Sequence, residues 1–124
     1  MSNNLLYNKK GLVVGVANER SLAWGIAESI SNSGGSLAFT YQNQALEKRI
    51  IPLAKRVNSN YTYQYDVQDY EKAPEFFKNL SKEFGKLDFL VHAVAFSDKE
   101  ELNGDYVDTS KENFLKTMEI SCYS

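Results

Sequence analysis

The sequence is poor in the residues that build several kinds of functional site. Its 124 residues include one cysteine and one histidine. A single cysteine excludes an internal disulfide and fits a reducing compartment, and the low number of both residues argues against a metal site built by this chain. Positive charge is not in excess, because 14 Lys and Arg stand against 16 Asp and Glu, a net charge of −2. That balance argues against binding to nucleic acid.

Long apolar segments are missing as well. No run reaches the roughly 18–20 apolar residues that a membrane-spanning helix needs, and residues 1–10 lack the apolar centre of a signal peptide. We therefore expect a soluble, cytoplasmic protein with no membrane partner. The hydrophobic content of 43%, with 8 Tyr, 7 Phe and 1 Trp, is enough for a packed core.

Apolar periodicity alternates between the strand pattern and the helix pattern along the chain. Short apolar runs predict strands at 11–16, 37–41, 61–65 and 87–95, and helical spacing begins near residues 21, 46, 69 and 109. This order predicts an α/β fold with a Rossmann-type doubly wound parallel sheet, and a flavodoxin-like strand order is the alternative. Four strand–helix units are fewer than the six strands usual in such domains. We therefore expect residues 1–124 to form a single, truncated dinucleotide-binding domain with an incomplete sheet.

The helical segments also predict which side chains are buried and which residue begins a helix. Leu22, Ile26 and Ile30 recur every fourth residue, which predicts an apolar stripe on the first helix. Thr109 stands three residues before Glu112, the spacing of a capping box that would open the last helix.

Three further features have structural interpretations. His92 lies inside an apolar run and is predicted to be a buried structural histidine rather than a catalytic one. Cys122 is predicted to pack in the core, because its helix face is apolar. The acidic residues within 98–101 are interpreted as a solvated surface.

Candidate ligand-binding residues follow the strands, because ligands of doubly wound sheets bind beyond the carboxyl ends of the strands. Gly15 and Ser21 flank a turn into a helix whose N-terminus can hold a phosphate, although spacing alone favours a turn glycine and a helix cap. Gln42 can hydrogen-bond a ribose or be an exposed loop residue. The lack of an adjacent cation favours NADH over NADPH. Asp66 and Val67 can contact adenine or begin a turn.

Taken in order, these segments resemble the bacterial-type NADH-dependent enoyl-acyl-carrier-protein reductases, a divergent branch of the short-chain dehydrogenases/reductases. The matching blocks are residues 15–27, 37–43, 66–67, 89–96, 102–107 and 120–124. Several blocks in the right order are more specific than any single motif.

The resemblance implies a role for each matching residue. Gly15, Ser21 and Leu22 would lie near the pyrophosphate of NADH, Gln42 near the ribose, Asp66 and Val67 at the adenine, and Val94 near the nicotinamide. Ala95, Ser97 and Leu102 would border the substrate pocket. The implied reaction is the reduction of trans-2-enoyl thioesters on acyl carrier protein in fatty-acid synthesis, by an enzyme that is usually a homotetramer.

The catalytic residues of that family are expected beyond Ser124. They are a Tyr and a Lys seven residues apart on one later helix, where two turns place both on one face. Tyr41 with Lys48 and Tyr65 with Lys72 have this spacing. We interpret both pairs as chance matches, because each Tyr ends a predicted strand and each Lys lies on the next helix.

Two interpretations of the chain as a whole therefore remain. The first is the cofactor-binding N-terminal portion of an enoyl-acyl-carrier-protein reductase, inactive when alone. The alternative is a catalytically dead remnant, or a binding module that pairs with a second chain carrying the rest of the sheet.

Overall fold

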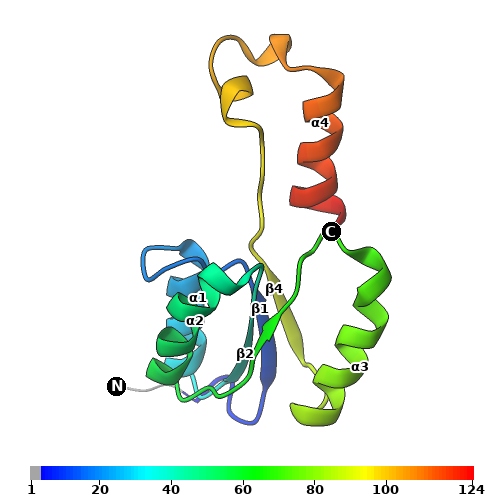
Figure 1. The fold of residues 1–124 in the computed structure, drawn as a ribbon. Helices are drawn as coiled ribbons and strands as arrows, with labels where there is room; N and C mark the ends of the chain where they lie inside the picture. Colours follow the sequence, from blue (N-terminus) through cyan, green and yellow to red (C-terminus); the bar gives the residue numbers. More distant parts are fainter. Residues whose placement is uncertain (1–3) are drawn as a thin grey trace. The chain divides into compact units, whose positions relative to one another are not determined.

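The computed structural model describes residues 4–124, which fall into two compact units, one ending at Ala93 and one spanning residues 94–124. The first unit contains β1 (Lys10–Val14), α1 (Leu22–Asn32), β2 (Ser36–Tyr41), α2 (Gln44–Arg56), β3 (Thr62–Gln64), α3 (Ala73–Glu83) and β4 (Phe89–His92) (Figure 1). The second unit contains α4 (Lys111–Met118), which continues as a π-helical segment, Glu119–Tyr123. No helix within residues 4–124 is both long enough and apolar enough to cross a membrane.

The strands form one parallel sheet in the order β3-β2-β1-β4. This order confirms the predicted α/β fold and selects the Rossmann-type arrangement over the flavodoxin-like one, in which β1 and β3 would be neighbours. The two inner strands, β1 and β2, are buried along almost their whole length. Near-continuous apolar strands of this kind are typical of parallel sheets with helices on both faces.

The main core lies between the sheet and the two helices on one of its faces. α1 and α2 lie on one side of the sheet and α3 on the other (Figure 1). Val13, Phe39 and Trp24 are each at most 1% exposed and belong to this core. Burying such large side chains contributes about 1.5–3 kcal/mol each, so the first unit has a substantial apolar interior.

The predicted apolar stripe on α1 is wrong for two of its three residues. Leu22 is 89% exposed and Ile26 is 41% exposed, whereas Ile30 is buried. The inward face consists of Ala23, Trp24, Ala27 and Ile30, of which the two alanines stand beside the predicted stripe in the sequence. Small side chains let the helix approach the sheet closely, so the buried face is centred on the alanines rather than on the larger aliphatic residues.

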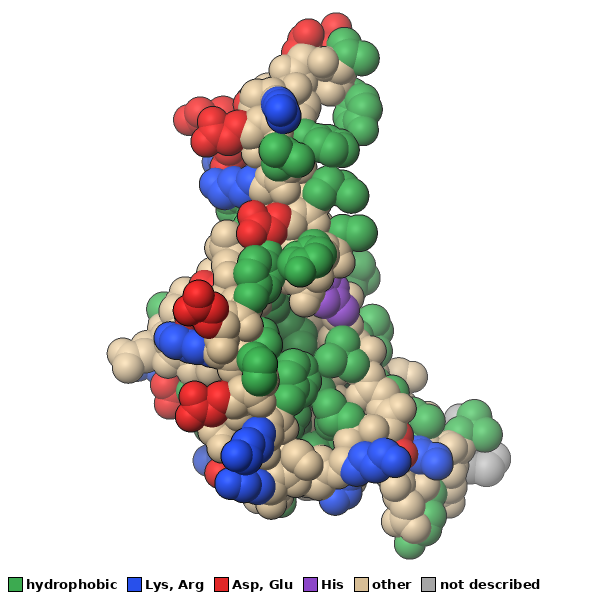
Figure 2. Space-filling model, turned by 90° about the vertical axis from the view of Figure 1, so that its right-hand side faces the viewer, with side chains coloured by type: hydrophobic (Ala, Val, Ile, Leu, Met, Phe, Trp, Pro, Cys, Tyr) green, Lys and Arg blue, Asp and Glu red, His purple; other side chains and the backbone are tan. Residues whose placement is uncertain are grey.

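His92 is exposed, so its prediction as a buried histidine is also wrong. β4 is an edge strand of the described sheet, and its neighbour β1 pairs Leu12 with Leu90 and Val14 with His92. Partners in a parallel ladder point to the same face. Leu12 is fully buried, yet Leu90 is 47% exposed. The side chains that cover this face of the sheet therefore reach β1 but not β4. Figure 2 shows the single histidine, in purple, at the surface.

The second unit corrects two further expectations. Ser110 rather than Thr109 is the N-cap of α4, because its side chain accepts a hydrogen bond from the amide of Asn113 at 3.1 Å. The same residue's own amide donates to the Glu101 carboxylate at 3.0 Å. Cys122 is exposed rather than packed in the core, since a helix with apolar periodicity buries its stripe only where another element covers it.

β3 and α3 are joined through aromatic side chains. The Tyr65 ring stacks on Phe76 with centroids 4.4 Å apart, and Tyr61 meets the Phe84 ring edge-on at 4.9 Å. The Tyr63 hydroxyl donates to the Glu83 carboxylate at 2.7 Å. Burial raises the pKa of Tyr63 above its usual value of 10.0, and the hydrogen bond to Glu83 raises it further.

Replacing Tyr63 with Phe should therefore change stability in a pH-dependent way. At pH 8 the loss of the Glu83 hydrogen bond should cost about 1 kcal/mol of unfolding free energy. In the unsubstituted chain Tyr63 loses its proton at a lower pH in the unfolded state than in the folded state. The free energy of unfolding therefore falls as the pH rises above about 10. Urea unfolding at pH 8 and at pH 10.5 should show a smaller fall in the free energy of unfolding for the Tyr63→Phe variant than for the unsubstituted chain. Equal pH dependence in Tyr63→Phe and in the control Tyr7→Phe would contradict the assignment.

Candidate functional site

The carboxyl ends of the parallel strands bring several of the predicted residues to one edge of the first unit. Gly15 directly follows β1, Gln42 directly follows β2, and Asp66 lies just beyond β3. The register of the parallel pairs fixes these ends on the same side of the sheet. The structure therefore places Gly15, Gln42 and Asp66 along one edge of the sheet, in the order of the neighbouring strands β1, β2 and β3.

Gly15 occupies a position that only glycine fits. Its φ is +116°, a conformation that L side chains rarely adopt. A Cβ built there would lie 2.0 Å from the carbonyl oxygen of Ala93. The amide of Ala93 in turn donates to the carbonyl of Val14 at 2.9 Å. The backbone ends of β1 and β4 thus pack directly on one another at the start of the loop.

Ser21 shapes this loop rather than capping α1 with its side chain. It stands at the N-cap position but makes no side-chain hydrogen bond to the helix amides. Its Oγ instead accepts from the amides of Ala17 at 3.0 Å and Asn18 at 3.1 Å. The Asn18 side chain accepts from the amide of Arg20 at 2.8 Å. Three loop amides are therefore held by two side chains, a pattern that strand and helix periodicity does not reveal.

The N-terminus of α1 remains open for an anion. No residue within 4–124 accepts a hydrogen bond from the amides of Leu22 or Ala23, and the first turn carries no acidic side chain. Unpaired amides and the positive end of the helix dipole favour a phosphate group at such a position. Leu22 is 89% exposed, so its surroundings are open to a ligand.

The residues after β2 and β3 differ in how far their side chains are already engaged. Gln42 is exposed, and Asn43 next to it caps α2 by accepting from the amide of Leu46 at 3.1 Å. Asp66 accepts from the amide of Gln68 at 3.0 Å, which confirms the interpretation that it begins a turn. Val67 is half-buried beside it. The predicted adenine contact of Asp66 and Val67 stays a prediction.

The remaining predicted residues lie in the second unit. Val94 begins this unit and is half-buried, whereas Ala95 is exposed. Ser97 is half-buried and its hydroxyl accepts from the Asn113 side chain at 3.1 Å. Leu102 ends a short 3₁₀ turn and is 69% exposed. Their predicted contacts with nicotinamide and substrate stay predictions.

Asn113 is a residue that sequence reasoning missed. It is only 3% exposed, and its side chain donates to Ser97 and accepts from the amide of Asp98 at 2.9 Å. The only signal in the sequence is a polar residue beside the apolar residues of the last helix. Asn113 therefore holds the segment that carries Ser97 in a defined conformation.

The acidic residues at 98–101 are only partly a solvated surface. Asp98 pairs with Lys116 at 3.1 Å, and Glu101 holds the N-cap of α4 as described above. Glu100 is exposed, as expected. Two of these carboxylates therefore contribute to the folding of the second unit.

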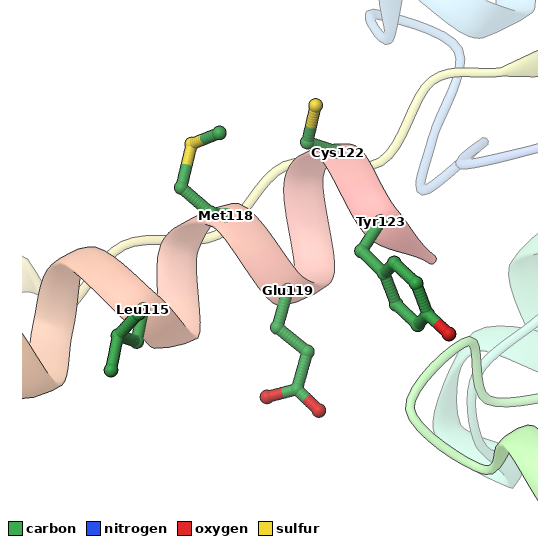
Figure 3. Close-up of a pocket in the computed structure, with 5 residues that line it drawn as sticks. All are labelled: Leu115, Met118, Glu119, Cys122 and Tyr123. Atoms are coloured by element: carbon green, nitrogen blue, oxygen red, sulfur yellow. The ribbon is translucent and has the colours of Figure 1, made fainter.

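A shallow hollow on α4 and the π-helical segment contains none of the predicted site residues. Its lining consists of Leu115, Met118, Glu119, Cys122 and Tyr123. Met118 and Cys122 point to the same side of the helix, away from Glu119 (Figure 3). The hollow is thus a surface feature of one helical segment, separate in sequence from the residues that follow the strands.

Neither of the two Tyr/Lys pairs shares a helix, which confirms that both are chance matches. Tyr41 ends β2 and Lys48 lies in α2. Burial and the nearby Glu47 raise the pKa of Tyr41. Tyr65 follows β3, and burial with nearby carboxylates raises its pKa as well, while Lys72 pairs with Asp69 at 3.0 Å. A tyrosine that donates a proton works better with a pKa lowered by a cation.

Comparison with known proteins identifies a family whose members match this chain. A family model described as Enoyl-(Acyl carrier protein) reductase matches residues 15–124. The chain is 51% identical over 122 residues to the enoyl-[acyl-carrier-protein] reductase [NADH] 2 of Rhizobium meliloti (strain 1021). The aligned region covers 98% of this chain and 46% of that relative. The chain thus spans about half the length of the curated relatives it matches.

Solved structures agree with this result. The enoyl-(acyl-carrier-protein) reductase of Anaplasma phagocytophilum, solved in complex with NAD, has a TM-score of 0.92 and 51% identity, covering 98% of this chain and 46% of that one. The Bacillus cereus enoyl-acyl carrier protein reductase, solved with NADP+ and indole naphthyridinone, has a TM-score of 0.90 and 37% identity, covering 97% of this chain and 48% of that one.

The tight packing at Gly15 makes a direct prediction. Gly15→Ala should lower the free energy of unfolding by about 2–4 kcal/mol, because the new methyl group meets the Ala93 carbonyl and the backbone is strained at positive φ. Gly25→Ala is the matched control on α1, where a Cβ meets nothing within 4 Å. It should leave stability unchanged or raise it by up to about 1 kcal/mol. Chemical unfolding would measure both, and a Gly15→Ala variant as stable as Gly25→Ala would contradict the contact.

Proposed function

This chain belongs to the enoyl-(acyl-carrier-protein) reductase family, and from that premise we propose that it forms the NADH-binding portion of such an enzyme. The observation that carries the proposal is the open N-terminus of α1 behind a loop that begins at Gly15 and is held by Ser21. We propose that residues 1–124 belong to one truncated dinucleotide-binding domain. The Rhizobium meliloti relative carries NADH as the cofactor in its name.

The proposed cofactor contacts follow the strand ends. The amides at Leu22 and the loop from Gly15 to Ser21 would hold the pyrophosphate, and Gln42 would hydrogen-bond the ribose. Asp66 and Val67 would hold the adenine. Val94, in the second unit, would lie near the nicotinamide. Three features of this chain fit the binding of a dinucleotide. Gly15 has no side chain, the loop amides are hydrogen-bonded, and the first amides of α1 are unpaired.

A preference for NADH over NADPH is proposed on the surroundings of Gln42. Gln42 is neutral, and the nearest cations along the chain, Lys48 and Arg49, are exposed residues farther along α2. A 2′-phosphate would lack a charged partner at the strand end. One solved relative, at 37% identity, was crystallised with NADP+, so the preference needs a direct comparison of the two cofactors.

For the complete protein we propose reduction of the trans-2 double bond of enoyl thioesters carried by acyl carrier protein, in fatty-acid synthesis. NADH, when bound, supplies the hydride. Ala95, Ser97 and Leu102 would border the substrate, with Ser97 oriented by its hydrogen bond from Asn113. The catalytic Tyr and Lys are expected outside residues 1–124, and a homotetramer in the cytoplasm is the proposed state of the complete enzyme.

NADH binding is the first test of this proposal. The purified chain should bind NADH in calorimetry and prefer it to NADPH. Ser21→Ala should weaken binding about ten-fold, because the amides of Ala17 and Asn18 lose their acceptor and the loop loosens. Ser29→Ala, at an exposed position of α1, is the matched control and should bind as the unsubstituted chain does. A folded chain that binds neither cofactor would refute the proposed function.

Turnover is the second test. The chain alone should not oxidise NADH in the presence of crotonyl thioester, because neither Tyr/Lys pair shares a helix. Loss of NADH absorbance would measure this, with a full-length relative as the positive control. Steady turnover by the chain alone would show that catalytic residues lie within residues 1–124 and would overturn the assignment.

The second candidate function is a non-enzymatic binding module or a remnant. The edge position of β4 and the exposed Leu90 beside the buried Leu12 favour a module that needs a further element on this face. Cofactor binding separates the proposed function from a remnant, because a remnant has no reason to prefer NADH to NADPH.

A further inference from the structure

A charge cluster links the last turn of α2 to the loop before α1. The Arg56 guanidinium pairs with the Glu19 carboxylate at 3.3 Å, although the two residues are 37 positions apart. The same guanidinium lies over the ring of Trp24, 5.4 Å from its centroid. Trp24 is 1% exposed and belongs to the first turn of α1. Arg56 therefore touches both the loop and the first turn of α1.

The placement of Glu19 creates an electrostatic problem for an anionic ligand. Glu19 stands two residues before Ser21, so its backbone lies within about 7 Å of the helix N-terminus along the chain. A carboxylate carried by a residue this close in the chain repels a phosphate group at the helix end and opposes its favourable field. The first turn of α1 itself carries no acid, so Glu19 is the acidic residue nearest to the N-cap in the sequence.

We propose that Arg56 is a positioning residue for the cofactor site, which pairs with Glu19 and so weakens the repulsion that this carboxylate exerts on an anion at the α1 N-terminus. This inference rests on the proposed function, because it concerns binding of the NADH pyrophosphate. The ring of Trp24 orients the guanidinium, and the planar group can stack on the ring and still reach the carboxylate. Arg56 touches no reacting atom, and its effect passes through Glu19.

A purely structural role for Arg56 makes different predictions. A basic residue in the last turn of α2 also interacts with the helix dipole, and Lys55 shares that turn. Both side chains of the Arg56–Glu19 pair are more than half exposed, and such pairs add little to stability. A purely structural role predicts that replacing Arg56 changes stability and leaves affinity unchanged, whereas our proposal predicts an effect of Arg56 on affinity.

The experiment measures NADH affinity by calorimetry at low and high salt for four variants. Arg56→Gln leaves Glu19 unpaired and should weaken binding on the order of three-fold at low salt. Glu19→Gln leaves a free cation near the site and should tighten binding by a similar factor, a gain that misfolding cannot produce. The double variant should bind like the unsubstituted chain, and Lys55→Gln is the matched control. Differences should shrink at about 1 M salt, where charges are screened beyond roughly 3 Å.

Each outcome separates the inference from the function on which it rests. If the unsubstituted chain binds no NADH, both fail. If it binds NADH but Glu19→Gln does not tighten binding, or Arg56→Gln behaves like Lys55→Gln, only the inference fails. Arg56→Lys keeps the charge and should retain most of the affinity, and its failure to do so would also overturn the electrostatic role. Far-ultraviolet circular dichroism checks each variant's fold, because Arg56 lies over the Trp24 ring and its replacement changes the fluorescence of that ring directly.

Discussion

The direct backbone contact between the ends of β1 and β4 is the constraint on which the candidate site depends. Gly15 has no side chain, and a Cβ there would overlap the Ala93 carbonyl. This contact lets the inner strand β1 and the edge strand β4 end side by side, and the chain continues from Gly15 into a short loop. The loop closes on Ser21, whose Oγ collects two of its amides, and α1 begins with its first amides unpaired. The helix end is therefore left open because the Ser21 hydroxyl bonds the loop amides instead of the amides of α1.

Local patterns in the sequence were sufficient for the order of elements and for the strand ends. Short apolar runs and helical spacing depend on neighbouring residues, and right-handed crossovers limit how such units assemble. Gly15, Gln42 and Asp66 could be located because each follows an apolar run directly. Burial was harder to predict. Leu22, His92 and Cys122 lie in apolar patterns but are exposed, because burial depends on whether another element covers that face.

The contacts that hold the site come from residues that no local pattern connects. Arg56 and Glu19 are 37 positions apart, and Asn113 reaches back to Ser97 across 16. Ser21 was identified at the right position, but as a simple cap, because helix-start statistics do not show that its hydroxyl turns back to the loop. Such contacts arise only when the sheet and helices are assembled. Sequence reasoning therefore finds candidate ligand-binding positions more readily than the residues that support them.

The division of the chain into two units has a consequence for the proposed chemistry. The boundary falls between Ala93 and Val94. The residues proposed for the pyrophosphate, ribose and adenine all precede it, whereas those proposed for the nicotinamide and the substrate follow it. The first unit holds its loop and its helix end through its own hydrogen bonds and packing. Under the proposed contacts, recognition of the adenosine diphosphate half of the cofactor would depend on the first unit. The residues proposed for the nicotinamide and the substrate belong instead to a segment of the second unit, Phe96 to Asp98 and its neighbours, that Asn113 and Ser121 hold by hydrogen bonds.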